Sequence, residues 1–201
     1  MIFGFLRRGL ARLRWGRQQA RRHAYVLLCS VGLGVAGAGK APQSSLPAVR
    51  SDASLAVYVF LATECPLSQS YTLPLNQLSQ RYAASKVTFT GVFPAEDDQN
   101  KNIRDFVNRY RVAFAVRRDP QQRLTRQFGA TVTPEAFLVD GQERVLYAGK
   151  IDDWAISLGR KRPVVTEKYL EEAIRAALAG RPVAVARTEA VGCLIEALHQ
   201  H

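Results

Sequence analysis

The first 38 positions of this 201-residue chain contain no aspartate, no glutamate and no lysine. They contain seven arginines, whereas residues 39–201 carry 21 basic and 17 acidic side chains. The formal net charge of +11 therefore belongs mainly to the N-terminus and not to a basic face of the folded part. This distribution argues against a nucleic-acid-binding protein.

Motifs for several common kinds of site are also missing. The sequence shows no convincing metal-ligand cluster, no phosphate-binding glycine loop and no Ser-His-Asp set. His199 and His201 lie close together, but we expect a frayed terminus there. A composition of 47% hydrophobic and 22% charged residues excludes collagen-like, coiled-coil and wholly disordered chains. We therefore expect one globular domain without a metal or a cofactor.

The apolar run at residues 24–38 is too short for a membrane-spanning helix, which needs about 20 residues. The seven arginines precede this run, and Ala36 and Ala38 end it with an A-x-A pattern, so residues 1–38 are predicted to be an export signal. Residues 39–54 are rich in Pro, Ser and Ala, which is typical of a linker. We expect a periplasmic or otherwise extracytoplasmic protein, in contact with a membrane only through its N-terminal segment if the signal stays uncleaved.

Other interpretations of the leader remain open. Arg21-Arg22 ahead of the apolar run allows a twin-arginine signal. An Arg-rich leader without acidic residues also occurs in organellar transit peptides, and residues 1–22 fit an amphipathic helix on a membrane surface. Neither of these last two explains both the apolar run and the A-x-A pattern.

From residue 55 onward, segments typical of strands alternate with segments typical of helices. The expected strands are 55–62, 87–93, 113–116, 136–139 and 145–148, and the expected helices are 71–84, 102–111, 121–128 and 166–178. Asp140-Gly141 between the last two strands predicts a hairpin. The order predicts one α/β domain over residues 55–201, with a central mixed sheet and helices on both faces.

Cys65 follows the first expected strand, where open α/β sheets place reactive groups. Pro66 suits the first turn of a helix. A helix that begins there directs unpaired amides and the positive end of its dipole toward Cys65, and both favour the thiolate. A lone cysteine after a strand is often only a small buried apolar residue, so a reactive and an inert interpretation are both open.

Thr133-Pro134 lies directly before the strand that forms the first half of the expected hairpin. Proline cannot join the hydrogen-bond ladder of a sheet, and it forces the preceding residue out of the helical region. The dipeptide therefore marks a strand entrance and is a candidate for a cis peptide bond.

These features together resemble the thioredoxin-like fold, a three-layer α/β sandwich. More narrowly, the chain is similar to extracytoplasmic redoxin-domain proteins of the peroxiredoxin-like (alkyl hydroperoxide reductase and thiol-specific antioxidant) group. The matching landmarks are TECPL at 63–67, TPE at 133–135, GKIDD at 149–153 and GCLI at 192–195. The resemblance implies a cis Thr133–Pro134 peptide against a catalytic Cys65, and a substrate-binding surface made by Thr63, Glu64, Pro66, Thr133 and Pro134.

Departures from better-known relatives narrow the expected chemistry. Ser68 stands where thioredoxins have the second cysteine of their C-x-x-C pair. Ala62 and Tyr58 stand where typical peroxiredoxins have Thr and Pro, which argues against the usual peroxide-reducing arrangement. Gln69 stands where a C-x-x-x-C copper carrier has its second cysteine.

Cys193 is the second cysteine of the expected mature chain, and an exported protein is expected to pair it with Cys65. In a structural interpretation, this disulfide staples the C-terminal tail across a loop of about 129 residues and stabilises the fold by about 4–5 kcal/mol. In a functional interpretation, Cys65 attacks and Cys193 resolves.

We expect an exported thiol-disulfide oxidoreductase whose partner is a protein or a small-molecule thiol or disulfide. A peroxidase that uses the same Cys65 on peroxide, and a non-enzymatic binding module with an inert disulfide, are the alternatives. Asp152 and Asp153 belong either to a polar loop or to a group that moves protons during exchange. Glu64 is expected to raise the pKa of Cys65 by like-charge repulsion.

Overall fold

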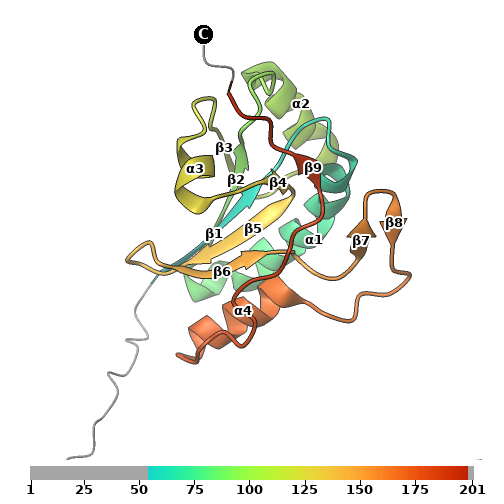
Figure 1. Ribbon diagram of the computed structural model, residues 1–201. Coiled ribbons are helices and arrows are strands. Elements are labelled where there is room, and N and C mark those ends of the chain that lie inside the picture. The colour runs from blue at the N-terminus through green and yellow to red at the C-terminus, as the bar shows by residue number, and fades with distance from the viewer. Residues whose placement is uncertain (1–53, 199–201) are drawn as a thin grey trace, which may run out of the picture. The chain divides into compact units, whose positions relative to one another are not determined.

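The computed structural model describes residues 54–198, in which a five-stranded sheet is covered by helices (Figure 1). Its strand order is β3-β2-β1-β5-β6, and β1, β2 and β3 run parallel, whereas β5 and β6 form antiparallel pairs. The strands are β1 (Leu55–Phe60), β2 (Val87–Phe93), β3 (Ala115–Arg118), β5 (Glu135–Val139) and β6 (Val145–Gly149). The predicted mixed sheet with an antiparallel hairpin at one edge is confirmed.

Helices cover both faces of this sheet. They are α1 (Pro66–Tyr82), continued by a 3-10 turn η1 (Ala83–Ser85), and α2 (Asn100–Tyr110), α3 (Arg123–Phe128) and α4 (Tyr169–Leu178). The crossovers through α1 and α2 step in the same direction across the sheet, which places both helices on one face. The apolar side chains of α4 join the same core, while those of α3 pack on the opposite face. This is the thioredoxin-like α/β architecture.

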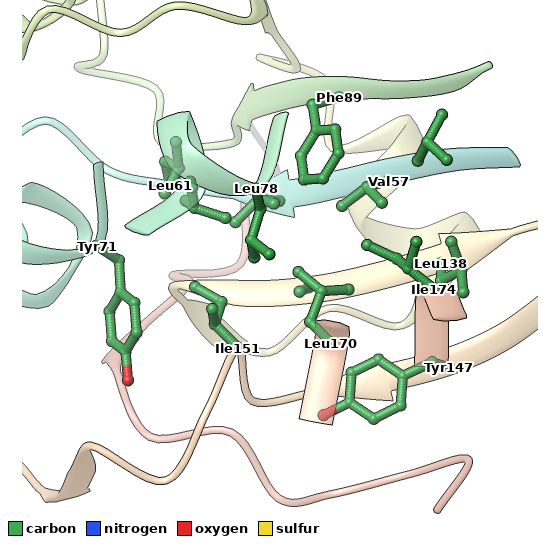
Figure 2. Packing of buried hydrophobic residues seen from close by; sticks show 14 of the residues in the cluster. Val57, Leu61, Tyr71, Leu78, Phe89, Leu138, Tyr147, Ile151, Leu170 and Ile174 are labelled. Atoms are coloured by element: carbon green, nitrogen blue, oxygen red, sulfur yellow. The ribbon is translucent and has the colours of Figure 1, made fainter. Parts of the chain in front are cut away.

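The apolar side chains of β1 alternate between these two faces. Val57 and Val59 belong to the large core beneath α1 and α4, and Phe60 belongs to the smaller cluster beneath α3. Both faces of the strand are buried, which is why its sequence is a continuous apolar run. Figure 2 shows the large core, where side chains of the sheet meet Leu170 and Ile174 of α4.

Two short antiparallel pairs were not predicted. They are β4 (Val132–Thr133) with β9 (Cys193–Leu194), and β7 (Ala155–Ser157) with β8 (Arg160–Lys161). Strands of two or three residues are too short to show an alternating pattern. In Figure 1 the red C-terminal segment returns from α4 past β6 and reaches β4 through β9.

Several expected boundaries were wrong by a few residues. Helix α1 begins at Pro66, which the sequence analysis considered suited to a first helical turn, and not at Tyr71, where the apolar periodicity begins. Strand β3 lies at Ala115–Arg118 rather than at 113–116. Helix α4 begins at Tyr169, because Thr166 does not cap it and instead donates its hydroxyl to Asp153.

Some predictions concern residues outside 54–198. These are the export signal, nearly all of the linker, and the interpretation of the terminal histidines. Among residues 54–198, no helix is both long and apolar enough to cross a membrane.

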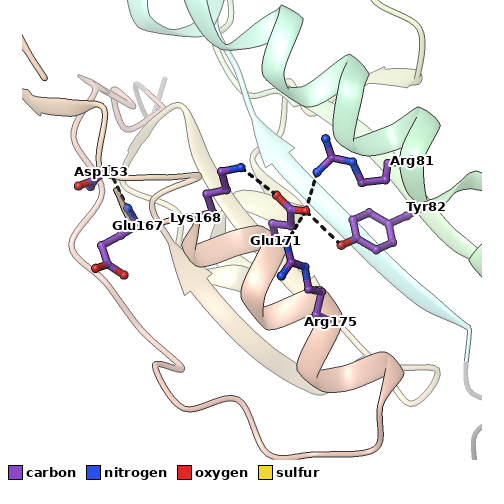
Figure 3. A network of polar contacts seen from close by, with 7 residues as sticks. All are labelled: Arg81, Tyr82, Asp153, Glu167, Lys168, Glu171 and Arg175. Atoms are coloured by element: carbon purple, nitrogen blue, oxygen red, sulfur yellow. Dashed lines mark hydrogen bonds and ion pairs between the residues drawn. The ribbon is translucent and has the colours of Figure 1, made fainter. Parts of the chain in front are cut away.

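A buried carboxylate ties α4 to α1. Glu171 is 4% exposed and accepts hydrogen bonds from Arg81 of α1 at 2.5 Å and from Arg175 at 3.0 Å, as Figure 3 shows. Burial raises the pKa of Glu171, but the two arginines together lower it by a larger amount, so the net shift is downward. Glu171 therefore stays ionised at neutral pH and bridges the two helices.

The lowered pKa of Glu171 predicts how stability depends on pH. A carboxyl with a depressed pKa contributes stability above its unfolded pKa of about 4.3, and that contribution is lost as the pH falls through the folded value. We expect Glu171→Gln to reduce the free energy of unfolding at pH 7 by about 1 kcal/mol, because both arginines are partly exposed to solvent. Urea denaturation followed by circular dichroism should show the difference shrinking below about pH 4.

The matched control is Glu172→Gln, because Glu172 is exposed on the same helix. This variant should unfold like the native protein at every pH. A constant difference between the native protein and Glu171→Gln from pH 7 to pH 3 would contradict the assignment.

Candidate active site

Cys65 is the N-cap residue of α1. Its backbone is extended, with φ −80° and ψ 115°, and its carbonyl accepts the first helical hydrogen bond from the N–H of Gln69 at 3.0 Å. Pro66 occupies the first turn, where a missing N–H costs nothing. Cys65 therefore lies at the positive end of the helix dipole, as the sequence predicts, and it is 2% exposed.

The Thr133–Pro134 peptide lies against Cys65. It is cis, and the Thr133 carbonyl oxygen lies 3.1 Å from Cys65 Sγ, whose thiol form donates to it. The register of β5 on β1 pairs Glu135 with Phe60, which brings the preceding two residues to the end of β1. The cis bond and its position against Cys65 are confirmed.

Cys193 reaches Cys65 from the far end of the chain. It pairs with Thr133 in the antiparallel β4–β9 ladder, and its Sγ lies 2.7 Å from Cys65 Sγ. No disulfide joins the two cysteines, although their sulfurs are adjacent. Only a small movement separates this arrangement from a disulfide, whose sulfurs lie about 2.05 Å apart.

The pKa values of the two thiols move in opposite directions. Burial raises the pKa of Cys65, but hydrogen bonds to Cys193 and Ser68 outweigh it and lower the pKa below 9.0. The pKa of Cys193 rises to about 11, because the thiol is buried and donates its proton to Cys65. The Cys65 thiol therefore ionises at a lower pH than the Cys193 thiol.

A groove of about 580 Å³ opens beside the two cysteines. Cys65, Thr133 and Cys193 contribute to its wall. Four carboxylates also line it, and none of its lining residues within the described range is Lys, Arg or His. These carboxylates belong to Glu64, Glu96, Asp97 and Glu196. The approach to Cys65 is therefore acidic.

Thr63 does not face this groove. Its N–H and its hydroxyl both donate to Asp98 Oδ1, and Thr63 is buried. Of the other predicted substrate-binding residues, Glu64 and Thr133 line the groove, while Pro66 is exposed in the first turn of α1 and Pro134 is buried. The substrate-binding roles of all five stay predictions.

Asp98 and Ser68 were missed by the sequence analysis. Asp98 is 2% exposed, and its Oδ2 has no hydrogen-bond partner within residues 54–198. Burial raises its pKa, and the hydrogen bonds from Thr63 oppose the rise only in part. No local pattern signals Asp98, whereas Ser68 stands three residues after the N-cap, a spacing typical of capping interactions.

Asp152 and Asp153 hold the fold together near the site. Asp152 Oδ1 accepts from the hydroxyl of Tyr71 at 2.6 Å. Burial raises the pKa of Asp153, but the hydrogen bonds from Thr166 and Glu167 and the charge of Arg162 bring it to about 2. Neither aspartate lines the groove beside Cys65. Their role in proton transfer stays a prediction.

The family model described as Redoxin matches residues 43–154, which is more than half of the chain. The chain belongs to the redoxin family. This family assignment agrees with the resemblance seen in the sequence, while the narrower peroxiredoxin-like assignment stays a prediction. No curated protein matches the chain.

Solved structures support the fold of this redoxin. A hypothetical protein from Sinorhizobium meliloti is 24% identical, with a TM-score of 0.63 over 72% of this chain and 80% of that one. An uncharacterized conserved protein from Geobacillus kaustophilus is 23% identical, with a TM-score of 0.66 over 74% and 79%. A putative thiol:disulfide interchange protein DsbE from Chlorobium tepidum is 23% identical, with a TM-score of 0.50 over 62% and 80%.

No group of three or more metal-ligating side chains gathers anywhere in residues 54–198. The candidate site itself brings two sulfurs together. A buried thiol with a lowered pKa suits a nucleophile that attacks a disulfide. A second thiol beside it can then attack the nucleophile's sulfur and release the bound substrate.

The hydrogen bond from Cys193 predicts a change in the pH profile of Cys65. Cys193→Ala removes the donor, so the pKa of Cys65 should rise and the midpoint of its alkylation by iodoacetamide should move to higher pH. The rate is followed by mass spectrometry on protein reduced with a phosphine.

Cys193→Ser is the matched control, because its hydroxyl still donates. Its midpoint should lie closer to that of the native protein. If the midpoints of all three proteins coincide, Cys193 does not stabilise the Cys65 thiolate.

Proposed function

We propose that this redoxin is an exported thiol-disulfide oxidoreductase in which Cys65 is the nucleophile and Cys193 is the resolving cysteine. The observation that carries the proposal is the contact of the two sulfurs at 2.7 Å, with one pKa lowered and the other raised. The structurally similar Chlorobium tepidum protein is described as a putative thiol:disulfide interchange protein, which agrees with this chemistry.

The proposed reaction has two exchanges. The Cys65 thiolate attacks one sulfur of the substrate disulfide, and the other substrate sulfur leaves as a thiolate and takes up a proton. Cys193 then loses its proton and attacks Cys65 Sγ, which releases the second substrate thiol and leaves a Cys65–Cys193 disulfide. Two electrons pass from the protein to the substrate, and the same steps in reverse oxidise a dithiol.

Ser68 stands where a C-x-x-C pair has its second cysteine, and we propose that Cys193 takes the role of that cysteine. In the α1 helix Ser68 lies in the turn beside Cys65, and hydrogen bonds to it lower the pKa of Cys65. The position that holds a thiol in a C-x-x-C pair thus supports the nucleophile here, while β9 supplies the second thiol. The export part of the proposal depends on the leader at residues 1–38.

A redox titration tests the proposed function. The chain has a third cysteine, Cys29, within the leader, and Cys29→Ser removes it. The full chain with this substitution is equilibrated in glutathione buffers, and its disulfides are mapped by mass spectrometry. We expect a Cys65–Cys193 bond with a midpoint between about −120 and −270 mV, the range of known oxidoreductases. Cys65→Ser should abolish turnover of a disulfide substrate, and Cys193→Ser should stall as a mixed disulfide on Cys65.

Two other outcomes are informative in the same titration. A bond that resists reduction below about −300 mV would assign the pair to a structural staple. A sulfenic acid on Cys65 after peroxide treatment, together with no disulfide turnover, would assign the site to a peroxidase.

The acidic groove predicts a preference among small disulfides. The dication cystamine should react with Cys65 about tenfold faster than the dianion dithiodipropionate at low salt, because carboxylates concentrate cations. The ratio should approach that of the free reagents at about 1 M salt, where the screening length is about 3 Å. The double substitution Glu96→Gln and Asp97→Asn removes two of the groove carboxylates and should reduce the ratio. Glu172→Gln should leave the ratio unchanged. A ratio indifferent to salt would contradict electrostatic selection.

A further inference from the structure

The C-terminal segment after α4 crosses one edge of the sheet before it reaches Cys65. We call residues 186–198 the strap. Ala148 of β6 donates to the carbonyl of Ala186 and accepts from the N–H of Thr188, both at 3.0 Å. The Thr188 hydroxyl accepts from the N–H of Lys150 at 2.8 Å. The strap is therefore anchored at Thr188, well before Cys193.

This anchor is tight because Gly149 has no side chain. Its φ of +131° is in a region that side-chain-bearing residues rarely adopt, and a Cβ there would lie 2.1 Å from the Thr188 carbonyl oxygen. Beyond Thr188, the strap makes no comparably close backbone contact with β6. Its remaining backbone contacts are those around Cys65.

Beyond the anchor, the strap covers the backbone edge next to Cys65. Leu194 pairs with Val132, Cys193 pairs with Thr133, and the N–H of Ile195 donates to the Thr131 carbonyl at 2.9 Å. The Gln122 side chain donates to the Glu196 carbonyl at 2.6 Å. No second strand can pair with Val132 and Thr133 on this side while β9 is in place.

The strap presents its side chains in a specific pattern. A Cβ on Gly192 would lie 2.2 Å from the Thr133 carbonyl oxygen, so a residue with a side chain does not fit there without moving backbone. Cys193 follows and meets Cys65. Leu194 is 80% exposed, whereas Ile195 packs against the cluster that contains Phe60. The edge thus accepts glycine, then cysteine, an outward residue and an apolar residue.

We propose that the strap occupies the binding site of the substrate, and that the substrate is a polypeptide that displaces it with an extended glycine-cysteine segment of the same pattern. This inference rests on the proposed function, because it names the partner of the same Cys65. The strap is an internal competitor: it shields Cys65 in the resting dithiol and returns to deliver Cys193.

Displacement gives the exchange a defined order. The strap leaves Thr133 and the substrate strand pairs there, so that its cystine sulfur meets Cys65, whose thiolate is then supported by Ser68 and the N-terminus of α1. The Cys65–substrate bond forms as the substrate disulfide breaks, and the departing thiolate takes up a proton. The strap then displaces the substrate strand from Thr133, and Cys193 releases its proton to solvent. Its attack on Cys65 Sγ expels the substrate sulfur as a thiolate, which takes up a proton.

Two peptides test whether the backbone edge of β4 prefers a segment with this pattern. One has the sequence of residues 189–196, EAVGCLIE, and the other differs only by Gly192→Ala. Each carries its cysteine as a mixed disulfide with thionitrobenzoate, whose release reports attack by Cys65. In a full chain with Cys29→Ser and Cys193→Ser, the glycine peptide should react at least about tenfold faster, because the alanine Cβ meets the Thr133 backbone. Equal rates would overturn the proposal.

A second comparison tests competition by the strap. Adding Gly192→Ala to the same full chain should loosen β9 and speed the reaction with the glycine peptide by about fivefold or more, while preserving its preference over the alanine peptide. Gly141→Ala is the matched control, since a Cβ there lies 3.7 Å or more from its neighbours. An unchanged rate in the Gly192→Ala chain would show that the strap does not compete.

Cystamine separates this inference from the proposed function. If Cys65 reacts with cystamine and both peptides react alike, the substrate assignment is wrong and the oxidoreductase proposal stands. If Cys65 reacts with neither cystamine nor the peptides, the proposed function fails and the substrate assignment fails with it.

Discussion

The antiparallel pairing of β4 with β9 is the interaction on which the candidate site depends. It joins residues 60 positions apart and places Cys193 opposite Thr133, whose carbonyl oxygen also contacts Cys65. Without this pairing the helix N-terminus still holds Cys65, but the second sulfur is gone and so is the donor that favours the thiolate. The ladder is only two residues long, and a short ladder is easier to open than a strand of the central sheet.

The electrostatics of the site favour one thiolate and one thiol. Burial opposes charge on both sulfurs, so a thiolate needs specific support. That support is concentrated on Cys65, through Cys193, Ser68 and the N-terminus of α1. The groove beside the site is lined by carboxylates, and the contacts that lower the pKa of Cys65 are direct hydrogen bonds.

The redoxin family assignment and the fold do not by themselves choose a reaction, because one scaffold supports several thiol chemistries. The geometry narrows the choice. Thr63 donates its hydroxyl to Asp98 rather than to Cys65, and Ser68 removes a local cysteine pair. The C-terminal segment supplies the second cysteine that the first turn of α1 lacks. For this reason the C-terminal segment is part of the proposed mechanism.

The sequence by itself determined the mixed α/β sheet, the placement of Cys65 at a helix start and the strand entrance at Thr133-Pro134. Each of these follows from local chemistry: a buried apolar run, a proline in the first helical turn, and a proline that cannot join a ladder. Family resemblance added the expectation that the two motifs meet. The tertiary structure decided that β9 pairs with β4, that Asp98 holds Thr63, and that Gln122 reaches the carbonyl of Glu196. These contacts join residues 35 to 74 positions apart, and no local period encodes them, because they arise only when the whole sheet brings distant loops to one edge.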